Sequence, residues 1–66
     1  MIIRVKYLEE ISEIESSVPV SVSEVLERID VPPSTVLAIH DETIIPHTSM
    51  INGDIKLELI VVSSGG

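Results

Sequence analysis

The 66-residue chain contains no cysteine, which excludes a disulfide framework, a thiolate metal site and a cysteine nucleophile. Its only aromatic residue is Tyr7, and its four Lys and Arg stand against eleven Asp and Glu, giving a formal net charge of −7. Phosphate binding needs clustered cations, and single-strand binding also needs aromatic stacking platforms. Nucleic acid is therefore not an expected partner.

Long apolar runs and the length for two domains are also missing. Apolar residues make up 44% of the chain, but no uninterrupted run approaches the roughly 20 residues that a membrane helix needs. The segment Met1 to Lys6 alternates apolar and basic residues, unlike a secretory signal, so we expect a cytoplasmic protein with no membrane partner. One small domain leaves little room for a buried catalytic cleft, and a self-sufficient enzyme is not expected.

Two alternating segments predict a pair of strands at the start of the chain. Between residues 3 and 7, apolar side chains alternate with Arg4 and Lys6, and this period of two predicts a half-buried strand. After an acidic turn, residues 11–20 predict a second, antiparallel strand. The residues that share one face of this second strand are Ile14, Ser16, Val18 and Val20.

A helix is predicted to follow these strands. Ser21 and Glu24 have the spacing of a capping box, in which each side chain bonds to the backbone amide of the other residue. The apolar residues recur at helical spacing and form one stripe, comprising Val22, Val25, Leu26 and Ile29. Pro32-Pro33 is predicted to end the helix, because proline lacks an amide donor and disfavours helix in the preceding residue.

The second half of the chain predicts three strands. Residues 35–39 and 43–45 are predicted to form a hairpin. The Asn52-Gly53 turn, whose residues tolerate positive φ, is predicted to lead into a strand over 54–62. On that strand one parity faces the core (Ile55, Leu57, Leu59, Val61) and the other faces solvent (Lys56, Glu58, Ile60, Val62). The order of elements predicts an α+β fold, with a mixed sheet of four to five strands packed on one helix.

This order, the turn around Asn52-Gly53 and the final Gly65-Gly66 pair resemble the β-grasp family of ubiquitin and, at this size, the sulfur carriers ThiS and MoaD. The ending also resembles that of the small archaeal modifier proteins. The resemblance covers the whole chain and implies a β-grasp domain over 1–62 and a Gly-Gly tail over 63–66. ThiS-like hairpins usually carry Asn-Gly where this chain has Asp41-Glu42; since neither is glycine, a longer turn or another turn type is expected.

The resemblance also implies a function for the tail. In this family a separate adenylyltransferase uses ATP and Mg to activate the terminal carboxylate, here that of Gly66. A sulfur donor, a desulfurase or sulfide, then converts it to a thiocarboxylate that serves a thiazole, molybdopterin or tRNA thiolation pathway through a sulfur-accepting synthase. The chain itself would bind no cofactor and would be a protein co-substrate, without catalytic residues of its own. Two alternatives stay open: a modifier conjugated through Gly66 to lysines of target proteins, and a plain interaction module that does not use the tail.

The tail residues suit passage into a partner's active site. Gly65 and Gly66 combine a small cross-section with freedom in φ, and Ser63 and Ser64 are small as well. Four extended residues reach roughly 13 Å, which would let the folded body stay outside the partner.

A docking surface is predicted on the last strand. Ile60 and Val62 lie on its solvent parity beside Lys56, and Arg4 and Lys6 join them if the first and last strands are neighbours. Clustered exposed apolar area commonly marks a protein interface, although two scattered aliphatic side chains need no such explanation. His40 and His47 are interpreted as loop or surface residues, because nothing in their spacing brings metal ligands together.

Overall fold

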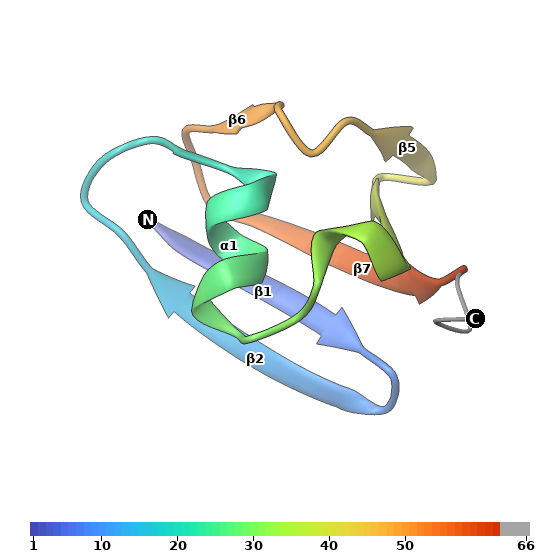
Figure 1. Cartoon of the computed structure of the whole chain (residues 1–66). Helices are drawn as coiled ribbons and strands as arrows, with labels where there is room; N and C mark the ends of the chain where they lie inside the picture. The colour runs from blue at the N-terminus through green and yellow to red at the C-terminus, as the bar shows by residue number, and fades with distance from the viewer. Residues whose placement is uncertain (63–66) are drawn as a thin grey trace.

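The computed structural model describes residues 1–62, in which one helix lies across one face of a twisted sheet (Figure 1). The predicted tail, Ser63 to Gly66, lies outside the described residues. In chain order the elements are β1 (Ile2–Tyr7), β2 (Glu10–Glu15), β3 (Val20–Ser21), α1 (Val22–Arg28), a 3₁₀ turn (Pro33–Thr35), β4 (Val36–His40), β5 (Thr43–Ile45), β6 (Met50–Ile51) and β7 (Ile55–Val61).

The five-stranded sheet has the order β2-β1-β7-β4-β5, and β3 and β6 form a separate two-stranded sheet. The central pair, β1 and β7, is parallel, whereas the other pairs are antiparallel. Figure 1 shows the first and last strands side by side beneath the helix. The α+β architecture predicted from the sequence is therefore confirmed, including the neighbouring first and last strands. Within residues 1–62 no helix is long and apolar enough to cross a membrane.

The core lies between α1 and the inner face of the sheet. The predicted helical stripe is confirmed, since three of its members are fully buried and Ile29 is half-buried. The strands contribute Ile3 and Val5 from β1 and Leu57 and Leu59 from β7. Full burial of one such aliphatic side chain stabilises the fold by about 1.5–3 kcal/mol, so these residues supply most of the driving force for a chain of this size.

Both ends of α1 are closed by local hydrogen bonds. The hydroxyl of Ser21 accepts the amide of Glu24 at 3.2 Å, which is one of the two bonds that the capping box predicts; in the described residues the Glu24 side chain does not bond back to the Ser21 amide. At the other end Asp30 adopts a φ of 59°, its amide donates to Glu27 O at 3.2 Å, and the amide of Val31 donates to Leu26 O at 3.0 Å. These two bonds make a Schellman motif, which ends the helix at Arg28. The prediction that Pro32-Pro33 ends the helix was wrong, because the chain has already turned away at Asp30.

The predicted second strand, 11–20, is also shorter than expected. β2 ends at Glu15, and the hydroxyl of Ser16 both donates to Val18 O at 2.7 Å and accepts the amide of Val18 at 3.3 Å. This serine turn takes the chain out of the ladder, so Val18 is exposed instead of facing the core. Val20 re-enters a strand in a different sheet, paired with Ile51.

The hairpin between β4 and β5 has a two-residue turn. His40 pairs with Thr43, and both intervening residues have positive φ, 53° at Asp41 and 66° at Glu42. Two positive φ values define the type I′ turn that Asn-Gly usually forms. The expectation of a longer turn or another type was therefore wrong; the non-glycine residues accept the strain, at a cost of about 1 kcal/mol each.

The segment around β7 differs from prediction in two further respects. Asn52-Gly53 precedes β7 as predicted, but neither residue lies in the left-handed region. Val61 was predicted to face the core, yet it is 45% exposed. The pairing of β7 with β1 stops at Leu59, so Val61 pairs only with Val36 on the β4 side and its other flank is open.

Candidate functional site

The face of the sheet opposite α1, here called the outward face, is the candidate functional site. Alternation along β1 and β7 turns the buried residues toward the helix and leaves the others exposed. In Figure 1 the helix and its connections lie over the inner face of the central strands. The outward face therefore consists of side chains that the fold does not need for its core.

Three basic residues, Arg4, Lys6 and Lys56, lie together on this face and are called the cationic group. The parallel register places Arg4 beside Lys56 and Lys6 beside Glu58, so the predicted proximity of β1 and β7 residues is confirmed. Arg4 Nε donates to Glu13 Oε2 at 2.9 Å, with both side chains more than half exposed. In such solvent contact the ion pair contributes little to stability.

Four aliphatic residues form the other half of the outward face and are called the apolar group. Ile60 pairs with Leu37, and Ile39 lies between Glu58 and Ile44. Ile60 and Ile44 are 43% and 60% exposed, which is high for residues of this size. Sequence reasoning found Ile60 but missed Leu37, Ile39 and Ile44, since only the register of β4 against β7 shows that they share its face.

Val62 marks the point where the described chain ends. It is 54% exposed, as predicted, and its amide donates to Thr35 O at 2.9 Å. Because β7 pairs with β4 up to Val61, this bond fixes the residue that precedes the tail to the body of the domain on the β4 side. Ser63, Ser64, Gly65 and Gly66, the predicted tail residues, are outside the described part.

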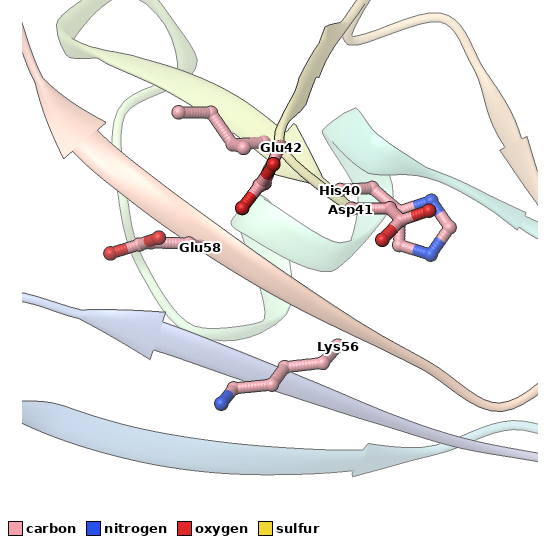
Figure 2. A pocket seen from close by; sticks show the side chains of 6 residues that line it. His40, Asp41, Glu42, Lys56 and Glu58 are labelled. Carbon is pink, nitrogen blue, oxygen red and sulfur yellow. The ribbon is translucent and has the colours of Figure 1, made fainter.

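A shallow hollow of about 360 Å³ lies between the β4–β5 turn and β7. Figure 2 shows His40, Asp41 and Glu42 reaching it from the hairpin and Lys56 and Glu58 from β7. Its lining contains a cation, Lys56, and several carboxylates together with the aliphatic Ile39. Such a lining suits contact with a polar protein surface. In residues 1–62 no group of three His, Cys, Asp or Glu residues is placed to hold a metal ion.

The two histidines play different parts in this region. His40 is the last residue of β4 and is half-buried at the edge of the hollow. His47 lies in the connection to β6, where its backbone carbonyl accepts the amide of Ser23 at 2.9 Å. The described contact of His47 is therefore structural and runs through its backbone.

No family model and no curated protein matches the chain in sequence. Among solved structures, the chain is similar to one in a crystal structure of ATBAG1 in complex with HSP70, with a TM-score of 0.71. The sequence identity is 16%, and the match covers 92% of this chain and 40% of that chain.

The chain has a ubiquitin-like β-grasp fold. At 16% identity the likeness shows the fold alone, and the chain spans about two fifths of the length of the protein that it matches. A fold of this kind hosts many functions, so function must be argued from the outward face and the tail.

Proposed function

We propose that the chain is a ubiquitin-like sulfur carrier, a protein co-substrate whose Gly66 carboxylate is activated by a separate adenylyltransferase. In the first step a carboxylate oxygen attacks the α-phosphorus of ATP, with Mg held by the partner, and pyrophosphate leaves. In the second step sulfide attacks the carbonyl carbon of the acyl-adenylate and AMP leaves. Where the nucleophile is the persulfide of a desulfurase, the acyl disulfide that forms must then be cleaved by a thiol, which becomes part of a disulfide as the thiocarboxylate is released. The product is a thiocarboxylate on Gly66.

The observation that carries this proposal is the anchoring of the strand that leads into the tail. β7 is the central strand, and the bond from the Val62 amide to Thr35 holds the chain to the body one residue before Ser63. A tail of four small residues then has a fixed origin and a reach of roughly 13 Å. A partner that binds the body can thus receive Gly66 at a defined place.

The outward face supplies the docking surface that this proposal needs. Ile60 lies one residue from the end of β7, and the apolar group extends from it across β4 and β5. Exposed apolar area of this kind is typical of protein interfaces. The activating enzyme would cover Ile60 and Val62 first, and the sulfur-accepting synthase would use the same face after the enzyme leaves.

A second candidate, an interaction module that does not use its tail, is favoured by the apolar group alone. The exposed Ile44 and Ile60, with the half-buried Leu37 beside Ile60, would serve a protein partner equally well whether or not Gly66 reacts. The two candidates differ in whether the carboxylate of Gly66 is modified, so the experiment must measure the chemical state of that residue.

Intact mass spectrometry of the protein from its own cells, followed by peptide mapping, tests the proposal. We expect a species in which sulfur replaces one oxygen of Gly66, and we expect the same species after incubation with ATP, Mg, a sulfur donor and the adenylyltransferase of those cells. Gly66→Ala, and a chain with one residue added after Gly66, should lose the product while they remain folded.

The other outcomes decide between the alternatives. Branched peptides that join Gly66 to a lysine would identify a protein modifier instead of a sulfur carrier. An unmodified chain that still binds the enzyme through Ile60 would leave only the interaction module. A native chain that continues past Gly66 without processing would rule out activation at this residue.

A further inference from the structure

The cationic group is unexpected in a chain of this charge. The net charge is −7, yet three of the four basic residues gather on the outward face, and the fourth, Arg28, lies in the last turn of α1. The same face also carries Glu13 beside Arg4 and Glu58 beside Lys6, so the unusual feature is that most of the cations of the chain share one face.

The pairing within the group is also unfavourable for folding. Arg4 and Lys56 are direct neighbours in the register, and like charges placed opposite each other destabilise a sheet. Among the described residues the only salt bridge joins Arg4 to Glu13, so neither Lys6 nor Lys56 has a carboxylate within ion-pair distance. The guanidinium of Arg4 uses only Nε in that bridge, which leaves its terminal nitrogens available.

A hollow of about 380 Å³ lies between these two cations. Arg4 and Lys56 line it together with Ile2, Ile55 and Asp54. One oxygen of Asp54 already accepts the amide of Ile2 at 2.7 Å, so that oxygen is committed to holding the start of β1 beside the turn. The hollow therefore combines Lys56, the terminal nitrogens of an Arg4 that is also bridged to Glu13, and the Asp54 carboxylate with an exposed apolar wall formed by Ile2.

We propose that the protein partner of the outward face presents Asp or Glu side chains to the cationic group, with one carboxylate in the hollow between Arg4 and Lys56. The same partner places an apolar surface on Leu37, Ile44 and Ile60. This inference rests on the proposed function, since it describes the chemistry of the enzyme surface that docks there.

Charge complementarity at short range supports this partner in spite of the net charge. The Debye length at physiological ionic strength is about 8 Å, so a contacting carboxylate responds mainly to the charges beside it. In the hollow these are Arg4 and Lys56 together with Asp54, of which one oxygen is bonded to the Ile2 amide. A second copy of the chain is a poorer occupant, because each copy carries −7. A nucleic acid would match the cations but would leave Leu37 and Ile60 uncovered.

A matched pair of charge reversals tests the inference. Lys56→Glu and Arg28→Glu change the net charge equally, from −7 to −9 (−7 − 2 = −9), but only Lys56 lies on the outward face. With the activating enzyme, we expect thiocarboxylate formation at limiting enzyme to slow by about tenfold for Lys56→Glu and by less than about twofold for Arg28→Glu. Added salt should slow thiocarboxylate formation by the wild type and reduce the difference in rate between the wild type and Lys56→Glu. Equal losses in the two variants would overturn the inference and leave the sulfur-carrier proposal standing.

A probe that needs no enzyme separates the two proposals. The probe is a synthetic helical peptide with Leu on one face and Glu on the other, and its control has Lys in place of each Glu. In NMR spectra of the ¹⁵N-labelled chain, we expect the Leu-Glu peptide to shift the amides of Arg4, Lys56 and Ile60, more weakly in Lys56→Glu but not in Arg28→Glu.

Each result of the peptide titration has a definite meaning. Equal or stronger binding of the Leu-Lys peptide, or of a short single-stranded oligonucleotide, would overturn an acidic protein partner. If the Leu-Glu peptide binds as expected while the enzyme never modifies Gly66, the outward face still binds an acidic partner, that partner is not the activating enzyme, and the sulfur-carrier proposal fails. The spectra also report whether each variant is folded.

Discussion

The two faces of the central strands have the same backbone but opposite content. On the inner face Ile3, Val5 and Leu57 are almost completely buried under α1. On the outward face the alternate positions hold Arg4 beside Lys56 and an Ile60 that is 43% exposed. Packing therefore explains the first set, whereas the second set includes neighbours that oppose folding. Residues that a fold does not need, in positions where they cost stability, point to selection for binding.

The largest expected effect is the loss of inner-face packing. Leu26→Ala removes a fully buried side chain of α1 and should lower the free energy of unfolding by about 2–5 kcal/mol, by lost transfer energy and the cavity left behind. Ile60→Ala on the outward face should cost less than about 1 kcal/mol. Urea unfolding of both variants checks this comparison.

A milder variant keeps this prediction measurable if Leu26→Ala does not fold. Ile3→Val, also at a fully buried position, should lower the free energy of unfolding by about 1 kcal/mol. A loss of more than about 1 kcal/mol for Ile60→Ala would contradict the distinction between the two faces, because a side chain that is 43% exposed should lose little burial.

A smaller effect, of opposite sign, is expected at the hairpin that borders the outward face. Glu42 has a φ of 66°, so Glu42→Gly should raise the free energy of unfolding by about 0.5–1 kcal/mol by relieving backbone strain. The control is Glu27→Gly at an exposed position of α1, which should lower it by about 1 kcal/mol. Thermal and urea unfolding measure both, and destabilisation by Glu42→Gly would show that this turn is not type I′ in solution.

The smallest expected effect lies within the cationic group. Lys56→Gln removes the repulsion from Arg4 and should stabilise the domain by about 0.3 kcal/mol. Lys6→Gln makes the same change of charge but removes the attraction to Glu58, so it should destabilise the domain by a similar amount. Urea titrations at low salt check the two signs, and both differences should shrink when salt is added. If both variants changed the free energy of unfolding in the same direction, the neighbours that the β1–β7 register gives to Lys56 and Lys6 would not be the cause.

Local sequence patterns were sufficient for most of the fold. The period of two in β1, the serine cap of α1 and the helical stripe each depend on residues a few positions apart, and the structure has all three. The order of these elements then left few ways to bury one helix stripe on one sheet face, which explains why the β-grasp arrangement could be predicted.

The missed features depend on contacts that alternation alone does not specify. Val18 keeps the parity of a core residue, but the hydroxyl of Ser16 bonds locally and removes it from the strand. Val61 also keeps that parity, but β1 ends before it and leaves it open to solvent. Asp41 and Glu42 take the turn conformation usually given to Asn-Gly, because a two-residue connection between β4 and β5 requires it.

By itself, the sequence determined the helix, the strands of the five-stranded sheet, most of its inner face and the Gly65-Gly66 ending, because periodicity and composition are local properties of the chain; the short β3–β6 pair was not predicted. Only the tertiary structure decided which exposed residues share a surface. The parallel register of β1 with β7 brings Arg4 to Lys56 across 52 positions of sequence, and the antiparallel register of β7 with β4 brings Leu37 to Ile60. The register between distant strands is fixed by burial of the inner face. The sequence therefore decides which residues lie on the outward face, and packing of the core decides which of them are neighbours.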